Sequence, residues 1–424
     1  MSRHLVHSRL EMKLRGHNWK QTRRLAKGRW ALGRVCIYGQ SAGFGPFSMK
    51  IVHIITGLNT GGAEVMLREL LKHSPRPQFE SQVISLTGIG PIGQSMRELG
   101  FQVSSLGMRP QLPDPGALWR LSRRLKRQKP DVVQTWLYHG DLIGGLAARL
   151  AGIEAVAWGI HISWLDAPQS KKSTLAMVKA GALLSPFVPR RIVCCAQSAL
   201  ELHERIGYDR TKMQVIPNGF DLGEFKPDEG ARDSVRRELG LESETPLVGL
   251  IGRFHPQKDH ENFVRAARIV AKNDARTRFV LIGSGNEWSN EQLNDWIESA
   301  GLKARFHLLG RRDDVARLSA SFDVLALSSS YGEAFPLVVG QAMACQVPCA
   351  VTDVGDSADL VGDTGRIVAP RDAPALAQGI RELLDLGLEG RAALGQRARR
   401  RIEERFSIQS VAARYHELYR EIAG

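Results

Sequence analysis

The fold class is decided by residues 323–344, which read DVLALSSSYGEAFPLVVGQAMA. The first five are apolar enough for a buried strand, the serine-rich segment after them has the composition of a loop, and an apolar helix is expected next. Pro336 is predicted to be the first helical residue, because it lacks the N–H group that would be unpaired there. The N–H groups of Leu337 and Val338 would then point into a crevice at the carboxyl end of the sheet, where the helix dipole favours negative charge. The stretch predicts a phosphate site, with an ordinary strand, loop and helix as the alternative.

A second strand followed by a loop and a helix start occurs at residues 247–259, LVGLIGRFHPQKD. Arg253 and Lys258 come directly after the apolar strand. Their chemistry suits a departing diphosphate, because a guanidinium can hold two oxygens at once and an ammonium adds a mobile charge. The alternative is that both are solvated surface charges. His255 either lines the phosphate site or only belongs to the loop.

The same plan opens at residues 49–64, MKIVHIITGLNTGGAE. Gly61 and Gly62 lack side chains, so backbone donors in this loop could approach phosphates closely. Glycine is also the usual residue of any tight turn, which is the alternative reading of the pair. His53 is expected to be a strand histidine without a chemical role.

Together these segments resemble the retaining GT-B glycosyltransferases of family 4, the large group that builds lipopolysaccharides, capsules and glycolipids. The resemblance covers residues 49–422. It implies an α/β fold with two doubly wound Rossmann-like domains facing a central cleft. It also implies a nucleotide diphosphate sugar as co-substrate, with no cofactor and no metal.

The resemblance implies roles for particular residues. Glu333 matches the first glutamate of the family's Glu-(seven residues)-Glu element and would lie by the donor sugar. Gln341 stands at the second position, where the family's glutamate binds the ribose hydroxyls; an amide can bond both hydroxyls but brings no charge. His161 matches a histidine that related enzymes place beneath the donor sugar, and a loop histidine without a role is the alternative. The other donor-binding positions would be Gly61, Gly62, Phe335, Pro336, Leu337 and Val338, with Arg253 and Lys258 on the diphosphate.

The implied reaction is retaining transfer of a sugar to a hydroxyl of a glycan or lipid-linked acceptor in cell-surface polysaccharide synthesis. A nucleotide-sugar 2-epimerase of the same fold would need no acceptor. A dinucleotide-dependent oxidoreductase is an alternative of another class, but Gly283-Ser284-Gly285 lacks the third glycine of that fingerprint, since position 288 is Trp. No Asp-x-Asp pair occurs in the chain, so protein donors are expected to meet the leaving-group charge.

Length and alternation agree with two domains. The chain has 424 residues and 43% apolar content, enough for two cores. Short apolar runs alternate with helix-length segments, which predicts parallel βαβ units. The expected strands are Ile51–Ile55, Gln82–Leu86, Val103–Leu106, Val132–Thr135, Ala155–Trp158 and Ile192–Cys195, then Leu247–Ile251, Phe279–Ile282, Arg305–Leu309, Asp323–Leu327, Cys349–Thr352 and Arg366–Ala369. We expect an acceptor-side domain over residues 49–217 and a nucleotide-sugar domain over residues 218–404.

The junctions between the domains can also be placed. Residues 215–221, VIPNGFD, read as a strand and a turn, because an Asn-Gly pair readily supplies positive φ. At the far end, Ser407 is expected to cap a helix. Val411, Tyr415, Leu418 and Ile422 form a stripe along that helix. In GT-B enzymes a final helix, here residues 405–424, crosses back onto the first domain.

Residues 1–48 differ from the rest of the chain. They hold ten Lys or Arg residues against one acid and so carry most of the net charge of +14. We interpret them as a basic, disordered leader or as sequence upstream of a true start at Met49. A basic tail that binds anionic lipid or nucleic acid is the alternative. Specific nucleic-acid binding is not expected once this leader is set aside.

The sequence also bears on membrane contact and on the redox state of the cysteines. No apolar run reaches the length of a membrane span, so any membrane contact must be peripheral. A basic helix suited to an anionic membrane would carry Arg120, Arg123, Arg124, Lys126, Arg127 and Lys129, although such runs are usually a solvated face. The cysteines are odd in number (Cys36, Cys194, Cys195, Cys345 and Cys349) and lack zinc-site spacing, which indicates reduced thiols. We expect a cytoplasmic protein that works at the inner face of the plasma membrane.

Overall fold

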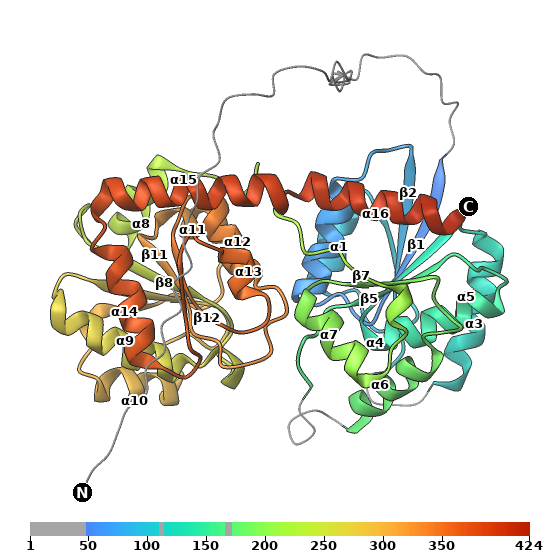
Figure 1. Ribbon diagram of the computed structural model, residues 1–424, viewed down its shortest axis with the longest axis horizontal. Helices are drawn as coiled ribbons and strands as arrows, with labels where there is room; N and C mark the ends of the chain where they lie inside the picture. Colours follow the sequence, from blue (N-terminus) through green and yellow to red (C-terminus); the bar gives the residue numbers. More distant parts are fainter. Residues whose placement is uncertain (1–47, 110–113, 166–171) are drawn as a thin grey trace, which may run out of the picture. The chain divides into compact units, whose positions relative to one another are not determined.

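The computed structural model describes residues 48–109, 114–165 and 172–424. The interpretation of residues 1–48 therefore lies, apart from Ser48, outside the described residues. Within them the chain forms two parallel β-sheets with helices packed around each (Figure 1). Both sheets belong to one compact unit.

The first sheet has, within the described residues, seven parallel strands in the order β3-β2-β1-β4-β5-β6-β7. The strands are β1 (Met49–Ile55), β2 (Phe79–Ser85), β3 (Gln102–Ser105), β4 (Val132–Trp136), β5 (Val156–Ile160), β6 (Arg191–Cys194) and β7 (Met213–Val215). The helices between them are α1 (Gly62–Lys72), α2 (Gly90–Glu98), α3 (Pro115–Gln128), α4 (Leu137–His139), α5 (Gly145–Leu150), α6 (Lys172–Leu184) and α7 (Gln197–Ile206). A π-helical turn (Gly140–Gly144) precedes α5.

The second sheet has six parallel strands in the order β10-β9-β8-β11-β12-β13, again counted within the described residues. They are β8 (Leu247–Ile251), β9 (Arg278–Ile282), β10 (Phe306–Leu308), β11 (Val324–Leu327), β12 (Cys349–Thr352) and β13 (Arg366–Val368). The helices are α8 (Glu229–Glu238), α9 (His260–Asn273), α10 (Glu291–Ser299), α11 (Val315–Ser321), α12 (Leu337–Ala344), α13 (Ser357–Val361), α14 (Ala373–Leu384) and α15 (Gly387–Arg405). Every strand expected from the sequence is present, and no end is displaced by more than three residues.

Each sheet has a point where the strand order reverses. In the first sheet this point lies between β1 and β4, and in the second between β8 and β11. In open parallel sheets, ligands bind outside the carboxyl ends of the strands at such a reversal. The loops that carry Gly61, Arg253 and Glu333 follow β1, β8 and β11, so the fold directs all three toward ligand-binding positions.

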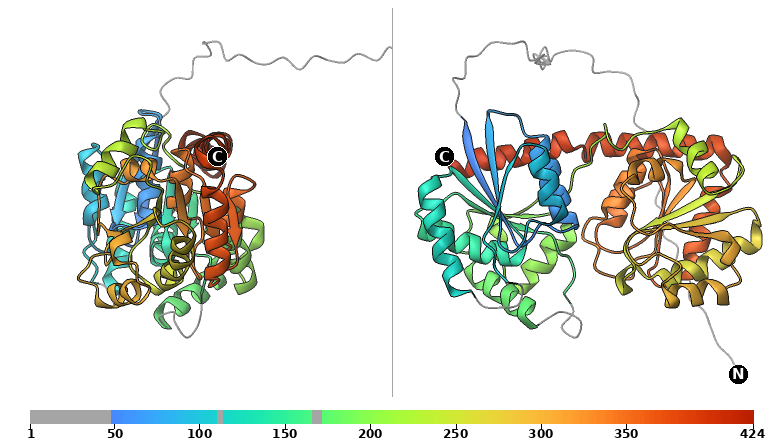
Figure 2. Two further views of the ribbon diagram at one scale, coloured as in Figure 1. Left: turned by 90° about the vertical axis from the view of Figure 1, so that its left-hand side faces the viewer. Right: turned by 180° about the vertical axis from the view of Figure 1, so that it is seen from behind.

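The last helix, α16 (Ile408–Ala423), packs on the first sheet, although α15 before it belongs to the second (Figure 2). Ser407 caps α16 by accepting a hydrogen bond from the N–H of Ser410, as predicted. The predicted stripe of Val411, Tyr415, Leu418 and Ile422 is buried. These side chains join the core beneath β1 and α1, so the final helix packs against elements of the first sheet.

One expectation at the domain junction was wrong. Asn218 and Gly219 were predicted to form a turn with positive φ, but neither residue adopts one. A Cβ atom at Gly219 would lie 2.8 Å from the Cα atom of Ile408 and 3.1 Å from Cβ of Val411. Glycine is needed here because the linker passes directly against the start of α16. Phe220 pairs with that segment through two backbone hydrogen bonds of 2.9 Å, to the carbonyl of Phe406 and from the N–H of Ile408.

Candidate active site

The start of α12 differs by one residue from the prediction. Pro336 is the residue before the helix, with φ −74° and ψ 102°, and Leu337 is the first helical residue. Among the described residues, the N–H groups of Leu337 and Val338 have no hydrogen-bond acceptor, whereas that of Val339 bonds the carbonyl of Pro336 at 3.2 Å. The two free donors at a helix start still make an anion-binding end. Phe335, in contrast, is 6% exposed and turns its ring into the core, against Phe220 and Phe406, so only its backbone can reach a donor.

Lys258 and Glu333 lie in contact, although 75 residues separate them. The Nζ atom of Lys258 is 2.5 Å from Oε1 of Glu333, and the hydroxyl of Ser329 donates to the same oxygen at 2.6 Å. The Glu333 residue is 7% exposed. Its loop is held by the N–H of Ser330, which donates to the carbonyl of Gln257 at 2.9 Å. The carboxylate is thus fixed by a cation and a hydroxyl at the edge of the second sheet.

Arg253 opens onto a cavity of about 610 Å³. The cavity brings together five predicted donor-site residues: Gly61, Arg253, Leu337, Val338 and Gln341. In the part of the chain that the structure describes, no carboxylate oxygen lies within 4.0 Å of the Arg253 guanidinium. A free guanidinium beside two free N–H groups is suited to hold phosphate oxygens.

The glycine loop approaches this cavity from the first sheet. A Cβ atom on Gly62 would lie 3.7 Å from Cδ1 of Leu337, so the loop meets the start of α12 across the cleft. A Cβ atom on Gly61 would lie 2.4 Å from Oε2 of Glu64, which folds back over the start of α1. Gly61 has an extended backbone with φ −159°, which any residue can adopt, and the Glu64 carboxylate is the end of a flexible side chain that can move aside, so the structure does not by itself require glycine at this position.

His161 follows β5 and stacks on Trp136, with ring centroids 5.2 Å apart and an angle of 24° between the planes. Burial lowers the pKa of His161 to about 4, so the imidazole is neutral at physiological pH. Its Nε2 atom is buried and has no hydrogen-bond partner among the described residues. Trp136 also stacks on Tyr415 of α16, with ring centroids 5.9 Å apart. The Nε2 atom of this neutral imidazole is therefore available for a hydrogen bond to a substrate.

Contacts across the cleft come from residues to which the sequence assigned no firm role. The hydroxyl of Ser163 donates to the backbone carbonyl of Glu333 at 2.5 Å. The Trp164 and Tyr331 rings lie 4.4 Å apart. Asp356 accepts hydrogen bonds from the N–H groups of Gln197 and Ser198 at the start of α7, at 2.6 and 2.9 Å. No local pattern marks such pairs, because each joins segments more than 150 residues apart.

Arg311 is a cavity residue that sequence reasoning missed. It lines the 610 Å³ cavity together with Arg312 and Ser284. Arg312 is held by Asp314 and Glu238, at 2.8 and 2.6 Å, whereas the shortest acid contact of Arg311 is 4.0 Å, to Asp313. The position of Arg311 in the sequence could have indicated this role, because Arg311 lies in the loop after β10 as Arg253 lies in the loop after β8. His255 caps the turn before Lys258 by accepting from the N–H of Gln257 at 3.2 Å, so its Nδ1 atom is already used.

Comparison with known proteins gives the family. The model of the family "Glycosyl transferases group 1" matches residues 231–401, and that of "Glycosyltransferase Family 4" matches residues 60–224. Together the two models account for most of the chain. The chain belongs to the GT-B glycosyltransferases of family 4 type. The two matched ranges correspond to the second and the first sheet of this glycosyltransferase.

Curated relatives and solved structures agree with this assignment. The glycosyltransferase is 29% identical over 320 residues to the Escherichia coli UDP-Gal:alpha-D-GlcNAc-diphosphoundecaprenol alpha-1,3-galactosyltransferase, covering 74% of this chain and 81% of the relative. It is 25% identical to the putative glycosyltransferase EpsF of Bacillus subtilis, covering 72% of this chain and 79% of the relative. Its fold is similar to the crystal structure of Anabaena Alr3699/HepE in complex with UDP, with a TM-score of 0.77 at 21% identity, over 87% of this chain and 99% of that one. The GT-B fold predicted from the sequence is therefore confirmed.

One cluster in this glycosyltransferase has the composition of a cation site. Glu69, His73 and Asp221 place ligand atoms within 4.8 Å of one another. The ammonium of Lys72 already lies among these groups, 2.7 Å from Asp221 and 3.9 Å from Glu69. The cluster is thus an ion-pair network in which a lysine supplies the positive charge. It ties α1 to the linker between the two sheets.

Proposed function

We propose that this glycosyltransferase moves a sugar, with retention of configuration, from a nucleotide diphosphate sugar to a hydroxyl of a glycan or lipid-linked acceptor in cell-surface polysaccharide synthesis. One observation carries the proposal. Arg253 and the free N–H groups of Leu337 and Val338 line one cavity at a strand-order reversal, and the Lys258–Glu333 pair follows the same two strands. These groups offer positive potential for a diphosphate and a fixed carboxylate for a sugar.

In the proposed mechanism, the bond between the sugar C1 atom and the diphosphate oxygen breaks. Arg253, Lys258 and the α12 N–H groups stabilise the charge that develops on the departing diphosphate. The acceptor oxygen then bonds C1 on the face that the diphosphate leaves, and its proton passes to a donor phosphate oxygen. Entry and departure on one face retain the configuration. Glu333 orients the sugar, and no residue forms a covalent intermediate.

His161 is proposed to hydrogen-bond the donor sugar. Its neutral ring can donate or accept one hydrogen bond through Nε2, and burial without a partner makes an unsatisfied atom costly. A sugar hydroxyl would satisfy it. Gln341, which lines the same cavity as Arg253, is proposed to bond the ribose. With these cations and donors in place, the transfer is proposed to need no metal ion and no cofactor.

A lipid-linked acceptor is proposed because the Escherichia coli relative is named for a diphosphoundecaprenol-linked substrate. In the described part of the chain, no helix is long and apolar enough to cross a membrane. We propose peripheral contact with an anionic membrane through α3. There, Trp119 is 63% exposed, and Arg120, Arg123, Lys126 and Arg127 line one surface. An anionic surface attracts such a basic face by about 1 kcal/mol per cation. Contact at the cytoplasmic face would fit the reduced, buried cysteines.

The test uses the purified protein with a panel of UDP- and GDP-sugars and polyprenyl-diphosphate acceptors. We expect transfer from at least one donor, with an α-linked donor yielding an α-linked product by NMR. A β-linked product would overturn the retaining mechanism. Conversion of the donor to its 2-epimer without any acceptor would instead identify an epimerase.

A further inference from the structure

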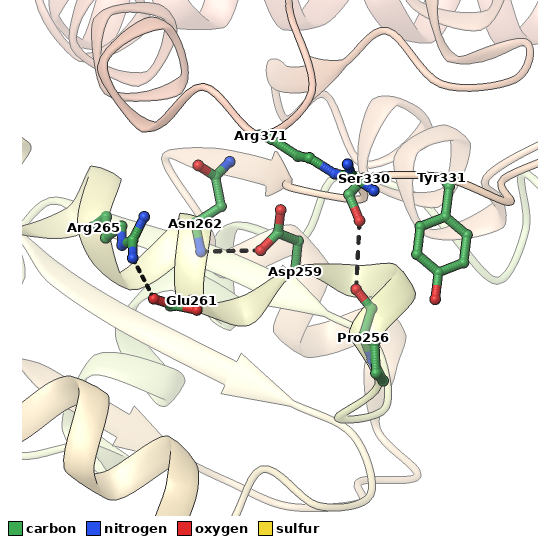
Figure 3. A pocket seen from close by; sticks show the side chains of 8 residues that line it. All are labelled: Pro256, Asp259, Glu261, Asn262, Arg265, Ser330, Tyr331 and Arg371. Atoms are coloured by element: carbon green, nitrogen blue, oxygen red, sulfur yellow. Dashed lines mark hydrogen bonds and ion pairs between the residues drawn. The ribbon is translucent and has the colours of Figure 1, made fainter. Parts of the chain in front are cut away.

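A second cavity lies next to the proposed reaction site, on the second sheet (Figure 3). Its volume is about 400 Å³, within the range of small-molecule sites. The start of α9 and the turn before it supply one wall, the loop before Glu333 a second, and Arg371 the third. The lining residues are Pro256, Asp259, Glu261, Asn262, Arg265, Ser330, Tyr331 and Arg371.

Asn262 shows that this cavity has an unused polar group. The residue is 6% exposed, and its Nδ2 atom has no hydrogen-bond partner among the described residues. Its backbone N–H is already satisfied by Asp259, at 3.3 Å. A buried amide without a partner costs about 1–3 kcal/mol. A ligand that accepts a hydrogen bond would remove this cost.

The charges of the cavity favour a neutral ligand. Glu261 and Arg265 neutralise each other at 2.5 Å. Asp259 and Arg371 line the same space, but no oxygen–nitrogen pair between them lies within 4.0 Å in the described structure. A hydroxyl group can accept from the guanidinium and donate to the carboxylate at once. A phosphate would meet the Asp259 carboxylate unfavourably, because like charges repel.

An aromatic wall adds a further feature of a sugar site. The Tyr331 ring stands at one end of the row of lining residues in Figure 3. Trp164, from the loop after His161, lies 4.4 Å from it. The apolar face of a sugar ring can pack on an aromatic ring while its hydroxyls reach the polar groups. Aromatic, amide, carboxylate and guanidinium groups in one cavity are therefore suited to a carbohydrate.

The cavity shares its loops with the proposed reaction site. Tyr331 is two residues before Glu333, and Pro256 is two residues before Lys258. A glycan whose attacking hydroxyl lies near Glu333 would extend past Trp164 toward this space. We propose that the cavity binds the sugar of the acceptor glycan that neighbours the attacking sugar. This inference rests on the proposed transferase function.

The test measures direct binding by saturation-transfer NMR with neutral di- and trisaccharides of glucose, galactose, mannose and N-acetylglucosamine. Two variants remove the polar groups. Asn262→Leu keeps the volume of the side chain. Arg371→Gly is chosen because residue 371 has φ +61°, a backbone conformation that glycine adopts without strain. Arg268→Ala, at an exposed position of the same helix outside the cavity, is the matched control for lost charge.

We expect at least one saccharide to bind the parent protein and Arg268→Ala equally, and each of the other two variants about tenfold more weakly. UDP affinity should be unchanged in all variants, since the diphosphate site is separate. Because Asn262 has no partner to lose, the Tm of Asn262→Leu should not fall. The proposal is overturned if no saccharide binds, or if both cavity variants bind as the parent does. Failure of the transferase proposal would appear separately, as absence of sugar transfer with saccharide binding intact.

Discussion

The Lys258 ammonium lies 2.5 Å from the Glu333 carboxylate, so two residues proposed to act on different parts of the donor neutralise each other. The Lys258 side chain is 18% exposed and that of Glu333 is 9% exposed. An arriving diphosphate would share the ammonium and leave the Glu333 carboxylate facing the sugar. If the proposed roles hold, the pair would link diphosphate binding to the orientation of the sugar.

Substitution of the two cations should separate catalysis from stability. Arg253→Ala and Lys258→Ala should each lower kcat by about 100-fold or more, because each removes charge stabilisation of the transition state. Lys258→Ala should also lower the free energy of unfolding by about 3 kcal/mol, since it leaves the buried Glu333 charge unpaired. Arg253 has no carboxylate partner within 4.0 Å in the described structure, so Arg253→Ala should unfold like the parent protein.

The double variant Lys258→Ala, Glu333→Gln is the control for the ion pair. It should regain most of the lost stability in urea unfolding and remain inactive. Near-normal turnover in both single variants would rule out the assignment of the diphosphate site.

Gln341 tests the ribose contact. Gln341→Glu should tighten donor binding several-fold, because hydrogen bonds to a charged group are about twice as strong as neutral ones. Gln341→Ala and Gln341→Leu should weaken it. The effect should appear in the donor KM rather than in kcat, since the ribose is remote from the breaking bond. Equal donor affinity in all three variants would show that Gln341 does not touch the nucleotide.

The buried histidines predict a loss of stability in acid. Burial lowers the pKa of His161, His203 and His260 to about 4. Each binds a proton in the unfolded chain below its ordinary pKa of about 6.5 but not in the folded protein until about pH 4. Stability is therefore fully present above pH 6.5 and falls as the pH drops from 6.5 to 4, by about 1.4 kcal/mol per pH unit for each group.

Urea unfolding across this window gives the measurement. His260 is 2% exposed, and neither ring nitrogen has a partner among the described residues. His260→Gln should therefore make the free energy of unfolding less dependent on pH in this window, by the equivalent of about one bound proton. An unchanged pH dependence would contradict the lowered pKa of His260. Between pH 7 and 8 these histidines should not make the free energy of unfolding depend on pH, either in the parent protein or in His260→Gln.

Membrane contact through α3 is tested by co-sedimentation with vesicles. The triple variant Arg123→Glu, Lys126→Glu, Arg127→Glu should lose about 100-fold or more in affinity for vesicles containing phosphatidylglycerol. The matched control makes the same charge change at exposed arginines of the second domain: Arg237→Glu, Arg268→Glu and Arg400→Glu. Equal loss in both triple variants would mean that net charge, rather than the α3 surface, governs binding.

Asp356 is predicted to hold the two domains together. Its carboxylate accepts from the N–H groups of Gln197 and Ser198, where the α7 dipole adds to the attraction. Asp356→Ala should increase the radius of gyration in small-angle scattering of the ligand-free protein. The same substitution should raise the donor KM, because fewer molecules are closed before binding. Identical scattering profiles would show that the contact does not control closure.

Elements that depend on a local pattern of residues could be predicted from the sequence. Every strand predicted from a short apolar run is present in the structure, because burial on both faces of a parallel sheet demands continuous apolar residues. The Ser407 cap could be placed because capping involves residues only three apart. The glycine loop, the Arg253 and Lys258 loop and the Glu333 loop could be assigned to the carboxyl ends of strands for the same local reason.

Contacts between these segments became visible in the folded structure alone. Pro336 was predicted to be the first helical residue, but it precedes the helix. The ring of Phe335 beside it packs against Phe220 and Phe406, which lie at the two junctions between the domains. Gly219 reads as a turn residue but is required by the packing of the linker on α16. The pairing of Lys258 with Glu333 and the cavity around Asn262 depend on the order of strands in the sheet. That order is set by the combined burial of all the strands and helices, and no single stretch of residues contains it.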